Sequence, residues 1–210
     1  MVISSTGDVI GPILGLLNYA GLAVFALTGA LSAARKRQTL VTFIFFAVIT
    51  GTGGGTVRDL LIDVPVFWSH GNIDLAICLA CAMIVWVLPS TIWSPRALDW
   101  LDAAGLAAFA VYGAAKSLSV GIAPVPAAVI GTVSACMGGI IRDILAGDPS
   151  IVIRPEIYVT AAALGATLFV LLTNVFGLAS PLAGTIAAAA AFILRGGAIR
   201  HGWCLPSYRR

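Results

Sequence analysis

The stretch GTGGGTVRDLL, residues 51–61, lies within a long apolar segment and places three consecutive glycines shortly before an Arg-Asp pair. A related stretch, CMGGIIRDIL, occupies residues 136–145 and carries two glycines at the same distance from a second Arg-Asp pair. The offset between Arg58 and Arg142 is 142 − 58, which equals 84. The two stretches therefore indicate an internal repeat.

The same offset relates two other segments, because 105 − 21 for Gly21 and Gly105 also equals 84. In that register AGLAVFALTGA (residues 20–30) and AGLAAFAVYGA (residues 104–114) are identical at eight of eleven positions. Shared hydrophobicity alone does not produce that level of identity. The repeat is therefore expected to run without a gap.

The composition is that of a helical membrane protein. Of the 210 residues 60% are hydrophobic and 10% charged, and the mean hydropathy is +1.02, whereas a soluble domain has roughly 25% charged residues. A membrane-spanning helix needs about 20 apolar residues. Seven such helices are predicted, at about residues 11–34, 40–61, 73–93, 99–120, 124–146, 155–176 and 180–195. The expected fold is an all-α integral membrane protein with one transmembrane domain over residues 1–210.

Each repeat contains three of the predicted helices, with repeat one at about residues 11–93 and repeat two at about residues 99–176. Because three is an odd number, the second copy must cross the membrane in the opposite direction to the first. The seventh helix, at about residues 180–195, has no counterpart, and its small residues suit close helix packing.

The basic residues predict the orientation. Those that flank the expected helices fall on one side if the loops alternate: Arg35, Lys36, Arg37, Arg96, Arg154, Arg195, Arg200, Arg209 and Arg210. Such residues favour the cytoplasmic side, so we expect the N-terminus outside and the C-terminus in the cytoplasm. Short loops and the lack of a targeting segment favour a bacterial inner membrane. The net charge of +3 is too small for a nucleic-acid surface, so no nucleic-acid partner is expected.

The glycine runs are the first candidate functional feature. They comprise Gly53, Gly54 and Gly55 in the second helix and Gly138 and Gly139 in the fifth. Glycine lets a helix leave regular geometry, and a broken helix at membrane depth marks a cavity or pathway. We therefore expect breaks in both helices, with close helix packing as the alternative.

Hydroxyl groups lie one turn before the glycines, on Thr50 and Ser134. They could line a pore, or bond to the carbonyl four residues earlier and bend the helix. The sequence leaves these two roles open.

Charged residues inside a span must pair or face water, which applies to Arg58, Asp59, Arg142 and Asp143. Adjacent helical residues point about 100° apart, so each Arg is expected to pair with another helix rather than with its own Asp. The pairs could clamp the helices or belong to an ion pathway.

Tyr112 and Lys116 lie four residues apart on the fourth helix and share a face. Tyr112 occupies the repeat position of Thr28 and is a candidate plug at a constriction. Lys116 either extends to the membrane surface or responds to voltage.

Other chemistry has little support in the sequence. GTGGGT lacks the Lys of a phosphate-binding loop, and Cys78 and Cys81 lack flanking His, Asp or basic residues. Neither His70 nor His201 lies within a predicted span. We therefore expect no enzyme, no metal site and no cofactor.

The doubled Gly-Gly-x-x-Arg-Asp motif, together with the segments at 20–30 and 104–114, resembles the prokaryotic trimeric intracellular cation (TRIC) channel family. The resemblance covers nearly the whole chain. It implies a homotrimer in membrane lipid, with one pore per protomer lined by the second and fifth helices and passing monovalent cations, chiefly potassium. It also implies that Lys116 is the voltage-linked charge.

One departure concerns a Lys-Glu-Val triplet of animal members that is associated with phosphoinositide binding. This chain has Thr56, Val57 and Arg58 there, so lipid regulation by that route is not expected.

Two transport mechanisms remain open. The first is a potassium-permeable channel, with potassium or sodium as permeant ions. The second is a secondary transporter of glycine or another small amino acid, which the same superfamily includes. The positive ends of half-helices after the glycines would suit a substrate carboxylate, whereas carbonyl ends suit a cation. The resemblance favours the channel.

Overall fold

The computed structural model describes residues 12–94 and 96–206. These residues form seven α-helices: α2 (Pro12–Arg35), α3 (Leu40–Leu61), α4 (Ile73–Val87), α5 (Ala97–Ser119), α6 (Pro124–Ala146), α7 (Val159–Asn174) and α8 (Ser180–His201). Three short 3₁₀ turns join them, η1 (Phe67–Ser69), η2 (Ser90–Ile92) and η3 (Ile151–Ile153). No strand occurs in these two described ranges, so the predicted all-α fold is confirmed.

The predicted helices are all present, with different ends for three of them. α4 stops at Val87 rather than near residue 93, because Pro89 disfavours helical backbone geometry at Leu88, which is extended. α7 begins at Val159 rather than near residue 155. α8 continues to His201, where Gly202 ends it with a left-handed φ of 67°. Arg209 and Arg210, which the orientation prediction uses, and the first residue of the 11–34 span lie outside the described residues.

Four helices, α2, α3, α6 and α8, are long and apolar enough to cross a membrane. The apolar helices α4 and α7 are shorter, with 15 and 16 residues. α5 has 23 residues but carries Asp99, Asp102 and Lys116, which lower its hydropathy. Buried charges on a central helix indicate that α5 is enclosed by the other helices rather than facing lipid.

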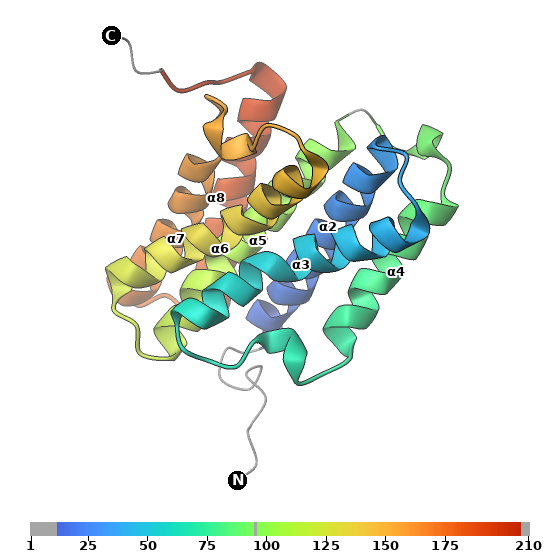
Figure 1. Cartoon of the computed structure of the whole chain (residues 1–210). Coiled ribbons are helices and arrows are strands. Elements are labelled where there is room, and N and C mark those ends of the chain that lie inside the picture. Colours follow the sequence, from blue (N-terminus) through green and yellow to red (C-terminus); the bar gives the residue numbers. More distant parts are fainter. Residues whose placement is uncertain (1–11, 95, 207–210) are drawn as a thin grey trace.

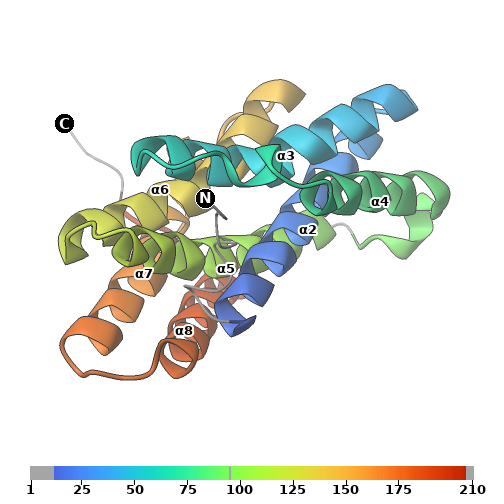
Figure 2. The same cartoon turned by 90° about the horizontal axis from the view of Figure 1, so that it is seen from below.

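The two repeats run in opposite directions. In Figure 1 α2 runs upward from its N-terminal end, whereas its counterpart α5 runs downward from its N-terminal end. The same reversal relates α3 to α6. Figure 2 shows α3 and α6 lying together on one side of α2 and α5. The inverted arrangement that the odd helix count predicts is therefore present.

Reciprocal contacts define a pseudo-twofold axis between the repeats. Gly21 packs against the ring of Phe109, and Gly105 packs against the ring of Phe25, where a Cβ atom would lie 3.0 Å from the ring. These are the same contact made twice, since 105 − 21 and 109 − 25 both equal 84. The two rings meet each other with centroids 5.3 Å apart. A self-complementary interface of this kind is what twofold symmetry produces.

A second reciprocal contact joins α3 to α6 at the glycines. A Cβ atom on Gly54 would collide with the carbonyl oxygen of Ser134, and one on Gly138 would lie 3.1 Å from the carbonyl oxygen of Thr50. Both helices remain α-helical through these positions. The predicted helix breaks are therefore wrong, because the glycines serve the alternative role of letting two backbones touch.

Replacing Gly54 by Ala should lower the free energy of unfolding by about 1–3 kcal/mol, because the new methyl meets backbone that cannot turn aside. Gly138→Ala should cost less, since its methyl has more room. Gly15→Ala is the matched control: no heavy atom lies within 4 Å of its Cβ, and Ala is favoured over Gly in helices by about 1 kcal/mol. Unfolding in detergent measures the stability of all three variants. Equal stability of G54A and G15A would contradict the backbone contact between α3 and α6.

Candidate functional site: two Arg-Asp clusters beside the helix crossing

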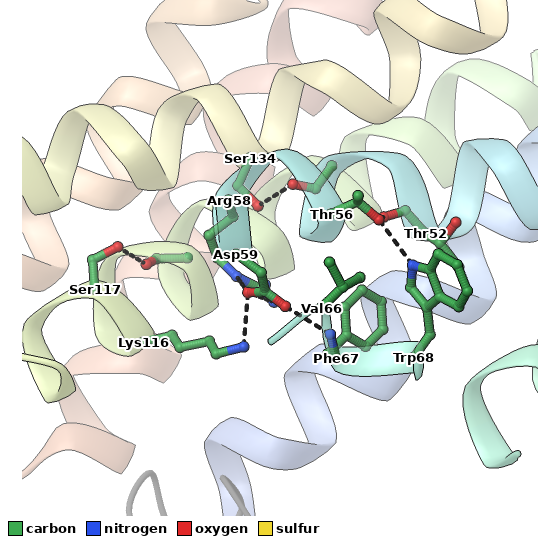
Figure 3. A network of polar contacts seen from close by, with 12 residues as sticks. Thr52, Thr56, Arg58, Asp59, Val66, Phe67, Trp68, Lys116, Ser117 and Ser134 are labelled. Atoms are coloured by element: carbon green, nitrogen blue, oxygen red, sulfur yellow. Dashed lines mark hydrogen bonds and ion pairs between the residues drawn. The ribbon is translucent and has the colours of Figure 1, made fainter. Parts of the chain in front are cut away.

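A buried ion cluster, here the Arg58 cluster (Arg58, Asp59, Phe67, Tyr112 and Lys116), lies at the end of α3 (Figure 3). Arg58 Nε donates to Asp59 Oδ1 at 2.8 Å, and Lys116 Nζ donates to the same oxygen at 2.7 Å. The backbone N–H of Phe67 donates to Asp59 Oδ2 at 2.9 Å. The charged side chains are at most 3% exposed. One carboxylate thus ties the end of α3 to η1 and, across the repeat interface, to α5.

The guanidinium of Arg58 is also held by aromatic rings. Its Cζ lies 5.6 Å from the ring centroid of Phe67 and 4.9 Å from that of Tyr112. Cations within about 6 Å of a ring centroid are attracted to the ring face. Tyr112 is 6% exposed, so this candidate plug is a packed partner of Arg58.

The second cluster, the Arg142 cluster (Asp102, Arg142, Asp143 and Tyr158), lies at the end of α6. Arg142 donates to Asp143 Oδ1 from Nε at 3.0 Å and from its NH2 group at 2.8 Å. The backbone N–H of Ile151 donates to Asp143 Oδ2 at 2.8 Å. The contacts of Asp143 with Arg142 and Ile151 repeat those of Asp59, since 143 − 59 and 151 − 67 both equal 84.

The two clusters differ in their further partners. Arg142 also donates to Asp102 of α5, with Nη1 2.6 Å from Oδ1. The Tyr158 hydroxyl lies over Gly139, where a Cβ atom would be 2.5 Å away, and next to Asp102. Arg195 of α8 stacks on Tyr158, with its Cζ 5.3 Å from the ring centroid. The seventh helix therefore supports one cluster and breaks the symmetry.

Two predictions about these charges need correction. Each Arg pairs with the Asp next to it, contrary to the expectation, because the long guanidinium side chain folds back over its own helix end. Arg142 does additionally pair across helices, as expected. Lys116 is 2% exposed, so its extension to the membrane surface is wrong.

The hydroxyl groups have unequal roles. Ser134 donates to the carbonyl of Gly54 at 3.3 Å, so it bridges the helix crossing rather than bonding within α6. Thr50 Oγ1 is buried and has no hydrogen-bond partner among the described residues. Gly53 faces Ile141 of α6, and Gly55 faces the ring of Phe67. The contact of α3 with α6 therefore contains Gly53, Gly54, Gly138 and the Ser134 hydroxyl. Gly55 and Gly139 instead pack against the two clusters, and the Thr50 hydroxyl faces Gly29 of α2.

Further buried polar residues in or beside the clusters were not among the predicted site residues, including Asn18, Asp74, Asp102, Tyr158 and Arg195. An ionisable residue in an apolar segment was the available signal for Asp74 and Asp102. Within residues 12–94 and 96–206, no group of three or more His, Cys, Asp or Glu side chains could hold a metal ion.

Comparison with known proteins identifies the relatives. The family model described as "Glycine transporter" matches residues 15–90 and again residues 99–174. The two matches have the offset of the sequence repeat, since 99 − 15 and 174 − 90 both equal 84. The chain belongs to the glycine transporter family.

Curated relatives of the chain include the UPF0126 inner membrane protein YadS of Escherichia coli K12, which is 34% identical over 198 residues covering 91% of this chain and 94% of YadS. YvgT, a UPF0126 membrane protein of Bacillus subtilis, is 37% identical over 171 residues, covering 78% of this chain and 83% of YvgT.

Solved structures of TRIC channels share the fold. The TRIC orthologue from Rhodobacter sphaeroides is 41% identical, with a TM-score of 0.84 over 91% of this chain and 99% of that chain. A structure described under conductance through TRIC cation channels is 26% identical, with a TM-score of 0.83 over 93% of this chain and 97% of that chain. The resemblance to the TRIC family is confirmed, and this glycine transporter family member is an integral membrane protein.

A buried and an exposed ion pair allow a matched test of burial. Asp102→Asn should lower the free energy of unfolding by about 3 kcal/mol, because it removes one carboxylate from a buried guanidinium. Asp148→Asn breaks the pair with Lys36, whose side chains are 39% and 42% exposed, and should cost less than about 1 kcal/mol. Similar losses in denaturant unfolding would show that the Arg142 cluster is no more than a surface pair.

Proposed function

We propose that the chain is a potassium-permeable, monovalent cation channel with one pore in each protomer, between the two inverted repeats. The likeness to TRIC cation channel structures over more than nine-tenths of the chain supports this most strongly. A homotrimer in the inner membrane, with the N-terminus outside and the C-terminus in the cytoplasm, is part of the same proposal, with sodium as a second permeant ion.

The proposed pore runs along the contact of α3 with α6. Gly54 and Gly138 lie there, together with the hydroxyl of Ser134 and the Gly54 carbonyl, which are groups that can replace water around a cation. Because backbone touches backbone at this crossing, an ion can pass only after the helices separate. The structure thus fits a closed state, and opening would release the Ser134 hydroxyl and the Gly54 carbonyl together.

A second candidate function is secondary transport of glycine or another small amino acid. The name of the glycine transporter family favours it, and inverted repeats are the usual architecture of alternating access. Both functions require α3 and α6 to separate. They differ in what crosses the membrane, which is measurable.

Recordings from purified protein in a planar bilayer with a potassium gradient should show discrete current steps that reverse near the potassium equilibrium potential. Gly54→Leu and Gly138→Leu should reduce conduction at least tenfold, since leucine at the crossing fills the path. Gly15→Leu, which faces open space, is the control for insertion. A silent bilayer together with glycine uptake by proteoliposomes would instead establish the transporter.

Lys116→Gln should flatten the dependence of open probability on voltage. One charge crossing the full field contributes about 2.3 kcal/mol per 100 mV, so the slope should fall by at most about one elementary charge per protomer. Lys116→Arg keeps the charge and should keep the slope. An unchanged slope in the Gln variant would make Lys116 a structural partner of Asp59 only.

A further inference from the structure

Two buried oxygens beside the Arg58 cluster have no partner. Asn18 in α2 and Asp74 in α4 are each 7% exposed, and Oδ1 of each accepts no hydrogen bond from the described residues. Buried polar atoms are normally satisfied, and a carboxylate more than an amide. This pair of acceptors therefore requires an explanation.

The helix packing places these two side chains at the same level. A Cβ atom on Gly51 would lie 3.2 Å from both the Leu22 carbonyl oxygen and Cys78 Sγ, so Leu22 and Cys78 meet around one glycine. Asn18 and Asp74 each stand four residues earlier (22 − 18 and 78 − 74). One helical turn of about 3.6 residues brings both back to the same faces, so they adjoin at the α2–α4 interface.

Lys116 lies within electrostatic range of Asp74 as well as being bonded to Asp59. An ammonium group has three donors, and Asp59 is the one acidic group to which the structure bonds Lys116 among the described residues. Asp59 is already engaged by Arg58 and by the Phe67 backbone. The ammonium is therefore bonded to a carboxylate that has other partners, and it interacts electrostatically with a second carboxylate that has an unpartnered oxygen.

The other repeat shows what these positions do when engaged. Asn18 corresponds to Asp102 and Asp74 to Tyr158, since 102 − 18 and 158 − 74 both equal 84. Asp102 binds Arg142, and Tyr158 lies beside it over Gly139. In the second repeat the Asp102 position therefore pairs with the arginine of its cluster, whereas Asn18 Oδ1 at the same position of the first repeat has no partner among the described residues.

We propose that Asp74, with Asn18 beside it, is the second acceptor of Lys116, so that the ammonium exchanges between Asp59 at the end of α3 and Asp74 at the start of α4. The exchange frees the end of α3 from α5. Its effect on gating rests on the channel function proposed above, but the exchange itself does not.

The test is a melting-temperature cycle on the detergent-purified chain with Asp59→Asn, Asp74→Asn and the double variant. Asp74→Asn should lower the melting temperature by only about 3 °C, because Asp59 still accepts Lys116. Asp59→Asn should lower it by about 6–12 °C, because it also takes the carboxylate from buried Arg58. The double variant should lose more than the sum of the single losses, by about 3 °C or more. The matched control is a second cycle in which Asp63→Asn, at an exposed position, takes the place of Asp59→Asn. In that cycle the losses of melting temperature from Asp63→Asn and Asp74→Asn should be additive.

The same cycle repeated with Lys116→Met should become additive, because the shared partner is gone. Additivity with Lys116 present, or coupling that persists without it, overturns the proposal. If the double variant does not fold, Asn18→Asp should rescue it by supplying a carboxylate next to position 74, and no rescue also overturns the exchange.

The gating arm uses Asp74→Asn and Asp74→Glu in bilayers. Asp74→Asn should shift the voltage of half-maximal opening, Asp74→Glu should restore it, and the shift should vanish with Lys116→Gln. A wild-type chain that passes no current refutes the channel, and the melting cycle still decides the exchange.

Discussion

The constraint on which the rest of the structure depends is the full use of one carboxylate at each helix end. Asp59 and Asp143 each bind the preceding Arg through one oxygen and a backbone N–H eight residues later through the other. Inside a membrane protein an unpaired charge is costly, so this arrangement fixes where α3 and α6 end and where the following 3₁₀ turns begin. The helix crossing is held between these two anchors.

The two repeats share their backbone contacts but differ in their buried side chains. The reciprocal glycine contacts keep the repeats interchangeable at the crossing, while Lys116 and Tyr112 occupy positions that hold Ser32 and Thr28 in the first repeat. The Arg142 cluster consequently gains an acid on α5 and support from α8, whereas the Arg58 cluster gains the ammonium of Lys116. The two clusters therefore share one carboxylate arrangement but differ in the helices and charges that surround it.

The helices and the inversion of the repeats could be predicted from the sequence. The length of each apolar segment is a local property, and the constant repeat offset appears when the chain is compared with itself. It could not separate a broken helix from a tight crossing, since Gly54 serves either purpose until the Ser134 carbonyl, from the other repeat, is located against it. The partners of Arg58 and Lys116 could not be predicted from the sequence for a related reason. Side-chain reach, which lets Arg58 fold onto Asp59, is not encoded in helical spacing.

Channel and transporter make different demands on this architecture. In alternating access the two ends must not open together, so a transporter needs its clusters coupled through the α3–α6 contact. A channel needs both ends open at once, which suits one braced cluster and one that adjusts alone. In the Arg142 cluster Arg142 pairs with two carboxylates and α8 stacks behind it, whereas in the Arg58 cluster Arg58 and Lys116 share the one carboxylate of Asp59. This difference favours a mechanism in which the Arg58 cluster rearranges alone. Such a mechanism suits a channel better than a transporter, which needs two coupled gates.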